Sequence, residues 1–410
     1  MKFAILGTDS DILQLTAAAL NAGHEIVWLG DVRPDDVAAA KQFVADPADR
    51  SPEWELLLDR GTAGGVLVGR GTALGALRAE QLKRLAVEGV PLLVVHPVLD
   101  SVLPYYEIDM ARRETGAVVQ HFNRVANHPA AAQLAEWVRN GHPTIGTIHQ
   151  VTCERRVASD TRVVVLAALA RDAELLAAVA GDIRRVSAIG PATLDSSFAS
   201  LQVQITAANV PSLRWSVGAI GANHAGLQLT LLGDRGTVTL RELSAAPNTG
   251  SSWQLETVVD DRRDVQPLES FDPARTAIER FAAAIAEDNA ERRAGCSTWE
   301  SATRAMEVVD AVELSLQKGR TIEVFQQQLT ERLAFRGTMA ALGCGLLLIA
   351  FLAVVLVAVL GGAEGLLQEK IAPGWPLVLL AVLAFFLLLQ AIPMMAQKPK
   401  QRDRQPPPQE

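Results

Sequence analysis

The sequence contains few cysteines and few aromatic residues. Its 410 residues include three cysteines, Cys153, Cys296 and Cys344, and no two of them have the C-x-x-C spacing of a metal clip. This excludes a disulfide framework and a structural zinc site, and it is typical of a protein from a reducing compartment. Aromatic residues make up 5% of the chain and hydrophobic residues 49%, so the hydrophobic share consists mainly of alanine, leucine and valine.

A surplus of positive charge is also missing. Lys+Arg number 38 and Asp+Glu number 46, which gives a formal net charge of -8 at pH 7. Proteins that bind nucleic-acid phosphates need a basic surface that releases counterions, so we expect no nucleic-acid partner. We also expect no signal peptide, because Thr8, Asp9 and Asp11 interrupt the first apolar run after a few residues.

Two stretches near the carboxyl terminus lack charged residues altogether. Each contains an apolar body long enough to cross about 30 Å of hydrocarbon, which takes roughly 20 helical residues. Basic residues precede the first stretch and follow the second, so the positive-inside rule places the amino-terminal part and the carboxyl-terminal tail in the cytoplasm. We therefore predict a multi-pass membrane protein with the lipid bilayer as a partner. The predicted segments are a linker at 326–336, a transmembrane helix at 337–363, a loop at 364–374, a second transmembrane helix at 375–395 and a disordered tail at 396–410.

The first of these stretches also has small residues at a regular spacing. Gly337, Ala341 and Gly345 recur every four residues, which permits two membrane helices to approach closely. A homo-oligomer therefore stays open beside a simple anchor. Neither stretch carries an ionisable residue, so a proton or ion path through the bilayer has no chemical carrier.

Residues 1–124 alternate short apolar runs with helical patterns. The runs KFAILG, EIVWLGD, GGVLVG, PLLVVHP and AVVQHF predict strands. Strands that alternate with helices predict a parallel sheet with helices on both faces. We therefore expect an α/β fold that begins with a Rossmann-like, doubly wound nucleotide-binding domain. The predicted helices lie in DSDILQLTAAALNAGH and at 34–44, 52–58, 78–87 and 105–114.

The pattern changes in residues 125–325. Segments such as LQVQITAA, GLQLTLLG, GTVTLRE and SWQLETVV alternate with period two, and a Gly233–Gly236 turn joins two of them. This predicts a second, α+β domain with a largely antiparallel sheet. Helices are predicted at 130–139 and 168–180, after a cap at Asp272, and after a capping box that begins at Ser297.

The order of these two domains resembles the Gfo/Idh/MocA family (glucose-fructose oxidoreductase, inositol dehydrogenase and MocA) over residues 1–325. Three segments carry the resemblance: the glycine-led strand Gly89–Pro97, the turn Gly233–Gly236, and the final helix and strand from Trp299 to Val324. The resemblance implies an NAD(P)-binding oxidoreductase that acts on a sugar-like or polyol substrate. It also implies NAD or NADP as the cofactor.

The glycine fingerprint of dinucleotide binding is incomplete. The six positions of G-x-G-x-x-G read Gly7-Thr8-Asp9-Ser10-Asp11-Ile12, so only the first glycine remains. Gly7, Thr8 and Asp9 are the candidate cofactor residues, but a carboxylate at Asp9 stands where backbone normally meets pyrophosphate. Two like charges 4 Å apart repel by about 4 kcal/mol at an effective dielectric of 20. The alternative, which we favour, is that Asp9 or Ser10 is a helix N-cap.

Three further positions are candidates for cofactor binding. Asp31 ends the second predicted strand, where an acid holds the ribose hydroxyls of NAD; a solvated turn is the alternative. Gly69 and Arg70 follow the third predicted strand, where an arginine can hold phosphate or carboxylate in its fork; a surface arginine in a turn is the alternative. Pro97 ends the glycine-led strand and matches the proline of the family motif.

The resemblance also predicts where proton-transfer groups should lie, and they are replaced. His96 stands where the family has a lysine before the proline, and counting back from Gly181 puts Ala167 and Arg171 at the positions of the family's aspartate and histidine. His96 is the one candidate catalytic residue, with a buried strand-end histidine as the alternative. A noncatalytic ligand-sensing or scaffolding protein is therefore the alternative function.

We predict no metal site. His121, His128, His142 and His149 occur in two pairs seven residues apart, but no H-E-x-x-H helix or carboxylate partner accompanies them. The possible partners are thus a nucleotide and a small polar substrate.

Overall fold

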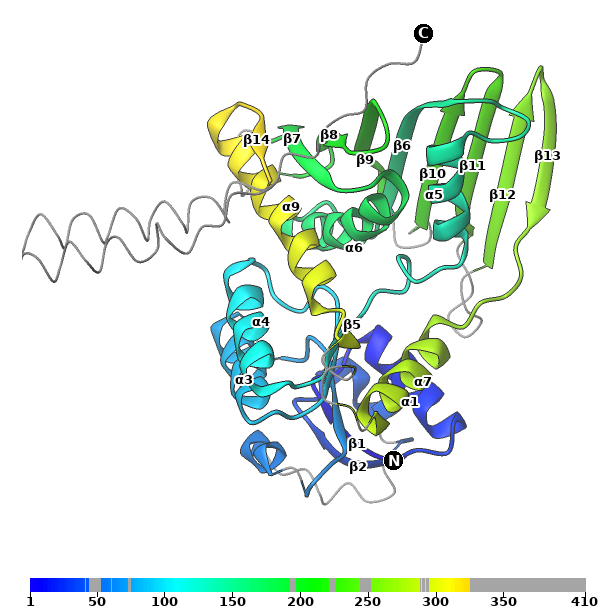
Figure 1. Ribbon diagram of the computed structural model, residues 1–410. Helices are drawn as coiled ribbons and strands as arrows, with labels where there is room; N and C mark the ends of the chain where they lie inside the picture. The colour runs from blue at the N-terminus through cyan, green and yellow to red at the C-terminus, as the bar shows by residue number, and fades with distance from the viewer. Residues whose placement is uncertain are drawn as a thin grey trace, which may run out of the picture. The chain divides into compact units, whose positions relative to one another are not determined.

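The computed structural model describes residues 1–40, 42–43, 53–59, 61–72, 75–191, 197–220, 226–243, 252–287, 289, 292 and 295–324. The chain divides into two compact units, Met1–Phe325 and Gln326–Glu410. Every described residue belongs to the first unit, which contains two β-sheets and the helices that cover them (Figure 1).

The first sheet is parallel throughout. Its order is β2-β1-β3-β4-β5, so the connection after β1 leads to one side of the sheet and the following one crosses to the other. All residues of β3, β4 and β5 are buried, as a parallel sheet with both faces covered requires. The predicted Rossmann-like sheet is confirmed. The strands are β1 (Lys2–Leu6), β2 (Glu25–Gly30), β3 (Gly65–Val68), β4 (Leu92–Val95) and β5 (Val119–Phe122).

Helices cover both faces of this sheet. On one face, α1 (Ser10–Asn21) packs beside α7 (Pro273–Ala286), and Phe3, Ile12 and Phe281 share one apolar cluster. On the other face lie α3 (Ala76–Val87) and α4 (Leu103–Thr115). Figure 1 shows the two pairs on opposite sides of the strands. The β2–β3 connection contains η1 (Pro34–Asp36), α2 (Val37–Ala40) and η3 (Trp54–Leu58).

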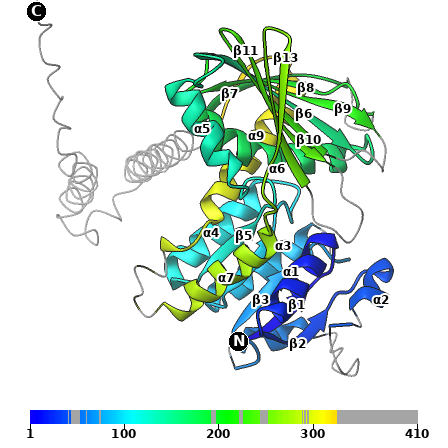
Figure 2. The same cartoon turned by 90° about the vertical axis from the view of Figure 1, so that its right-hand side faces the viewer.

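The second sheet has the order β13-β12-β11-β10-β6-β9-β8-β7-β14, in which only the β6–β9 pair is parallel. Strand β8 alternates exposed and buried residues along its length, and helices cover its buried side (Figure 2). The largely antiparallel second sheet is therefore confirmed. Its strands are β6 (Ile148–Val157), β7 (Ile183–Ile189), β8 (Gln202–Ala207), β9 (Ser212–Ile220), β10 (Gly226–Gly233), β11 (Gly236–Leu243), β12 (Ser252–Val259), β13 (Arg262–Pro267) and β14 (Ile322–Glu323). The covering helices are α5 (Ala130–Asn140), α6 (Arg162–Ala180) and α9 (Trp299–Lys318).

The predicted capping box at the start of α9 is wrong. The N-cap residue is Thr298, but its side chain makes no capping hydrogen bond. Instead its hydroxyl accepts from the backbone N–H of His121 (3.1 Å), and the Ser297 hydroxyl donates to the carbonyl of Val119. Both hydroxyls therefore fasten the start of α9 to strand β5.

The prediction of a multi-pass membrane protein is corrected. Among the described residues, no helix combines the length and the apolar character that a membrane crossing requires. The most apolar long helix, α6, carries Arg171, Asp172 and Glu174 in its middle. The predicted linker, spans, loop and tail (326–336, 337–363, 364–374, 375–395 and 396–410) lie outside the described residues.

Candidate functional site

Two loops meet where the direction of the sheet's connections reverses. In an open α/β sheet, this point at the carboxyl ends of the strands forms the crevice where ligands bind. The loop after β1 and the loop after β3 lie side by side there, because Gly69 N–H donates to Leu6 O (3.0 Å) and Gly71 N–H to Thr8 O (3.2 Å). The structure thus brings together candidates 61 or more residues apart in the sequence.

Asp9 is the N-cap of α1. Its Oδ1 accepts from the backbone N–H groups of Asp11 (3.0 Å) and Ile12 (2.9 Å), and its Oδ2 accepts from the N–H of Arg70 (2.9 Å). Burial raises the pKa of Asp9, although the hydrogen bonds from Arg70 and Ile12 oppose the shift. The N–H groups that would meet a pyrophosphate at this helix end are therefore satisfied by the protein's own carboxylate.

Asp31 is also bound within the protein. It has a left-handed backbone (φ 53°), and its carboxylate pairs with Arg78 and accepts from Thr72 N–H (2.9 Å) and from the Thr72 hydroxyl. The Arg78 side chain is fully buried and donates from Nη1 to Gln81 (3.0 Å). Asp31 therefore lies at the crevice as predicted, but it joins β2 to the start of α3 rather than forming a solvated turn. Arg33 donates its N–H to Thr8 Oγ1 (2.9 Å) just before η1.

The glycines of the loops after β1 and β3 permit these two loops to pack closely against each other. Gly7 has φ +84°, and a Cβ there would lie 2.5 Å from Arg78 Nη2 and 2.8 Å from Gly69 O. A Cβ on Gly69 would lie 2.5 Å from Ile12 Cγ1. Gly7 therefore keeps the tight turn of the first fingerprint glycine. The space beside it contains the Arg78 guanidinium.

His96 is buried at the end of β4. It is 2% exposed, and neither ring nitrogen has a hydrogen-bond partner of normal geometry. The ring lies edge-on to Tyr105 (6.0 Å between centroids) and His121 (5.6 Å). Burial, followed by the charge of His121, lowers the pKa of His96 to about 3. At neutral pH the ring is thus neutral and without a proton relay, as a buried strand-end histidine would be.

Two arginines hold the backbone at His96 and Pro97. Arg70 donates from Nε to Pro97 O (2.9 Å), and Arg171 donates from Nε to His96 O (3.1 Å). Arg171 also lies 3.6 Å from Asp11 through Nη2 and Oδ2. Burial lowers the pKa of Arg70, and the like charge of Arg171 lowers it further. The position matched to the family histidine therefore faces the end of β4 but carries a permanent cation.

Ala167 lies on α6 beside a small cavity. The cavity has a volume of about 20 Å³ and is lined by Pro97, Ala167 and Met306 among others. This is room for about one water molecule. The alanine side chain itself can transfer no proton, and the acidic group that lines this cavity is that of Asp100.

A buried polar cluster that the sequence patterns did not predict lies between β5 and α6. Glu174 accepts from Asn123 Nδ2 (2.7 Å) and Ser301 Oγ (3.1 Å), and it pairs with His121 Nε2 (2.6 Å). Burial alone would raise the pKa of Glu174, but the charge and hydrogen bond of His121, with the Asn123 amide, lower it to about 2. Asp172 of α6 is likewise fully buried. Asn123 and Glu174 are 51 residues apart, and no local pattern indicates the pairing.

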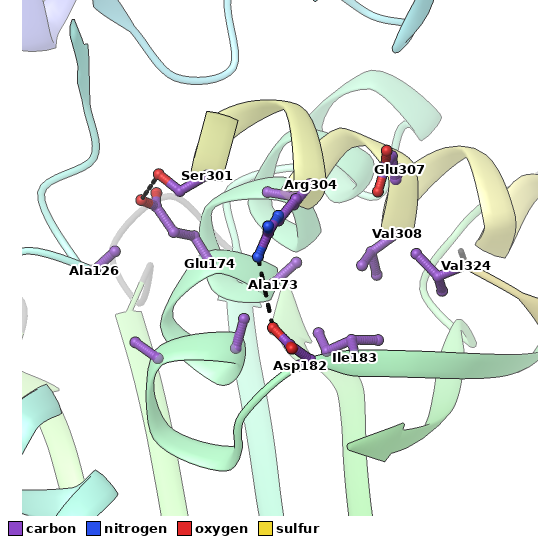
Figure 3. Close-up of a pocket in the computed structure, with 13 residues that line it drawn as sticks. Ala126, Ala173, Glu174, Asp182, Ile183, Ser301, Arg304, Glu307, Val308 and Val324 are labelled. Carbon is purple, nitrogen blue, oxygen red and sulfur yellow. Dashed lines mark hydrogen bonds and ion pairs between the residues drawn. The ribbon is translucent and has the colours of Figure 1, made fainter. Parts of the chain in front are cut away.

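A pocket of about 270 Å³ lies between α6 and α9 (Figure 3). Glu174 and Ser301 form one end, Val308 and Val324 lie at the other, and between them Arg304 lies 3.6 Å from Asp182. The volume is just below the roughly 300 Å³ at which ligand pockets begin. Within the described part of the chain, no group of three His, Cys, Asp or Glu side chains is placed to hold a metal ion.

Comparison with known proteins relates this fold to oxidoreductases. No protein-family model and no curated protein matches the sequence. Among solved structures, a putative NADPH-dependent oxidoreductase from Desulfitobacterium hafniense is 17% identical, with a TM-score of 0.63 over 79% of this chain and 97% of the other. KijD10, a 3-ketoreductase from Actinomadura kijaniata solved with NADP, is 17% identical, with a TM-score of 0.60 over 77% and 97%.

A third similar structure is a putative myo-inositol dehydrogenase from Sinorhizobium meliloti, which is 16% identical with a TM-score of 0.59 over 79% of this chain and 99% of the other. The chain therefore has the same fold as these three oxidoreductases. The predicted resemblance is confirmed at the level of the fold. Fold does not define activity, which depends on the groups in the site.

Proposed function

We propose that this protein binds NAD(P) in the crevice of its parallel sheet and acts as a ligand-sensing protein without hydride-transfer turnover. The observation that carries the noncatalytic part is the state of His96, which is buried and neutral and whose polar contact is with the backbone of Ala170. A general acid or base must reach the proton it transfers and have a pKa near the working pH. His96 meets neither condition, and Ala167 and Arg171 supply no substitute.

The binding part of the proposal rests on the fold and on the crevice. Gly7 keeps the tight turn after β1, and Asp31 lies at the end of β2, where ribose hydroxyls are held in dinucleotide-binding folds. The position of Asp31 matches the ribose position, although its carboxylate already pairs with Arg78 and accepts from Thr72. The pyrophosphate position fits less well, because Asp9 already accepts from the N–H groups at the start of α1. A putative NADPH-dependent oxidoreductase and a 3-ketoreductase solved with NADP have the same fold. These two cofactors are therefore the first ligands to test.

An active sugar or polyol oxidoreductase is the second candidate. The observation in its favour is the similarity over 99% of a putative myo-inositol dehydrogenase. This function would require a proton-transfer group that reaches the crevice from a part of the chain other than His96.

Calorimetric titration of the full chain with NAD⁺, NADH, NADP⁺ and NADPH tests the binding. We expect at least one of them to bind with a dissociation constant in the micromolar to millimolar range, and no binding at millimolar ligand would overturn the proposal. Assays of the same protein with sugars and polyols test the absence of turnover. Steady hydride transfer that persists in His96→Phe would favour the second candidate. It would also mean that a group other than His96 is the acid or base.

A further inference from the structure

Arg70 and Arg171 come from different elements but reach the same short stretch of backbone. Arg70 follows β3 and Arg171 lies in the middle of α6, and their Nε atoms donate to the carbonyls of two consecutive residues, Pro97 and His96. Consecutive carbonyls belong to one dipeptide, so both guanidinium groups lie at the end of β4. The effect of the Arg171 charge on the Arg70 pKa reflects this shared position.

The two positive charges are weakly neutralised. Among the described residues, Arg70 forms no salt bridge, and Arg171 has only the 3.6 Å contact with Asp11. Asp9 lies next to Arg70, but its oxygens accept from backbone N–H groups, one of them that of Arg70 itself. Asp9 and Asp100 therefore act on the Arg70 guanidinium only at a distance. Placing two like charges together in a partly buried site costs free energy that a bound anion would offset.

We propose that Arg70 and Arg171 form an anion-binding subsite at the carboxyl edge of the parallel sheet, which takes a phosphate or carboxylate group of the ligand. This inference rests on the proposed function, because it names the two arginine charges that hold the ligand in the crevice of the parallel sheet. The Nε atom of each arginine donates to a backbone carbonyl, which fixes the plane of the guanidinium group. The Nη donors then remain for an oxyanion. A planar fork matches the two oxygens of a phosphate or carboxylate.

The subsite explains how the crevice accepts an anion although the helix end is closed. In a dinucleotide-binding fold, the pyrophosphate meets free N–H groups at the start of the first helix. Here Asp9 occupies those groups, and its other oxygen holds the backbone of Arg70 at 2.9 Å. One carboxylate thus caps the helix and positions the loop that carries the arginine, so the positive charge for an anion comes from side chains.

Titration of the full chain with inorganic pyrophosphate, malonate, NAD⁺ and NADP⁺ tests this subsite. We expect the wild-type protein to bind pyrophosphate or malonate, and Arg70→Gln or Arg171→Gln to weaken that binding about tenfold or more, because each variant removes a charge-assisted hydrogen-bond donor. Arg70→Lys keeps the charge without the fork and should bind with intermediate affinity. Arg113→Gln is the matched control, since Arg113 is an exposed residue in the last turn of α4.

The outcomes separate this inference from the proposed function. Pyrophosphate binding that depends on both arginines, with no NAD(P) binding, supports the subsite and overturns the cofactor. NAD(P) binding that is unchanged in Arg70→Gln and Arg171→Gln overturns the subsite and leaves the cofactor. Malonate bound more tightly than pyrophosphate assigns the site to a substrate carboxylate, and no anion binding at 10 mM, roughly the upper end of weak specific affinity, overturns the subsite. Circular dichroism of each variant ensures that lost binding is read only from folded protein; where a Gln variant unfolds, the Lys variant carries the comparison.

Discussion

Asp9 shows how one side chain can replace a ligand. It satisfies the N–H groups that a phosphate would otherwise meet and also holds the loop after β3. Asp9→Ala is expected to lower the free energy of unfolding by about 2 kcal/mol, because it removes an N-cap and leaves the Arg70 N–H without an acceptor. Asp9→Asn keeps an acceptor oxygen and should lose less stability. It should also bind pyrophosphate more tightly than the wild type, because a negative charge is gone.

Urea denaturation of the full chain measures both variants, and Ser10→Ala on the next residue is the control for the helix end. Equal losses in Asp9→Ala and Ser10→Ala would contradict the role given to Asp9.

Glu174 gives the protein an acid-sensitive interaction. Its pKa in the folded protein is lowered to about 2 from an ordinary value of 4.5. A depressed acid contributes stability that is present above the unfolded pKa and is lost as the pH falls through the folded pKa. The free energy of unfolding should therefore fall by up to about 3 kcal/mol between pH 4.5 and pH 2 on account of this group.

In Glu174→Gln this part of the acid response should be missing, as measured by denaturant titrations at several pH values. Glu279→Gln, an exposed glutamate on α7, is the matched control. An acid response in Glu174→Gln as steep as in the wild type would show that other carboxylates dominate it.

At the scale of elements, α6 is fastened to the second sheet by a buried ion pair. Arg155 of β6 donates from Nε to Asp172 Oδ2 (2.9 Å), and Trp215 of β9 donates to the same oxygen (2.8 Å). Asp172→Leu should destabilise the protein by about 3–5 kcal/mol, because it leaves a buried guanidinium without this partner. The double variant Arg155→Met with Asp172→Leu should be closer to the wild type, as thermal unfolding of both variants can show. If the double variant loses as much stability as Asp172→Leu and Arg155→Met lose together, the two residues do not act as a pair.

Sequence patterns predicted the strands whose burial is continuous, as in β3, β4 and β5, or strictly alternating, as in β8. The runs in β3, β4 and β5 are entirely buried, and their apolar sequences predicted them. Strands β7 and β13 were not predicted: β13 is exposed along its whole length at the edge of the sheet, and β7 buries only Ile183 and Val186. Ser297 and Thr298 match a capping box, but their hydroxyls bond to β5 instead, which no local pattern reveals.

In the candidate site, local contacts were predictable from the sequence and contacts between distant residues were not. Asp9 caps the helix that begins at the next residue, so its capping role follows from local sequence. The partners of Asp31 and Glu174 lie 41 or more residues away and depend on the order of the strands and helices. His96 was located correctly at the strand end, but its burial depends on packing against Tyr105 and His121, which the strand pattern does not contain.

At the scale of the whole described unit, the chain returns from the second sheet to complete the first. Phe281 of α7 is fully buried and stacks on Phe3 of β1, with 5.9 Å between ring centroids. Trp299 of α9 stacks on Tyr105 of α4 at 4.8 Å. The boundary predicted at residues 124–125 stays a prediction, and α7 belongs in space to the first sheet although it follows the second in sequence.

Phe281→Ala should therefore lower the free energy of unfolding by about 3–5 kcal/mol. Because both sheets depend on this return, circular dichroism and tryptophan fluorescence should report the same shifted transition. Val265→Ala, at a half-exposed position on β13, is the control and should change stability by less than about 0.5 kcal/mol. Two separate transitions in Phe281→Ala would show that the two sheets unfold independently.

The late position of α7 has a consequence for synthesis on the ribosome. Chains are made from the amino terminus at about 5–20 residues per second, and early domains fold as they emerge. Helix α1 covers part of the face of the parallel sheet that includes Phe3 and Gly65, but the part that Phe281 contacts stays open until residues 273–286 have been translated. For that interval the nascent protein exposes an apolar surface to neighbouring proteins and to chaperones. A ribosome stalled before α7 would leave this face of the amino-terminal sheet incompletely covered.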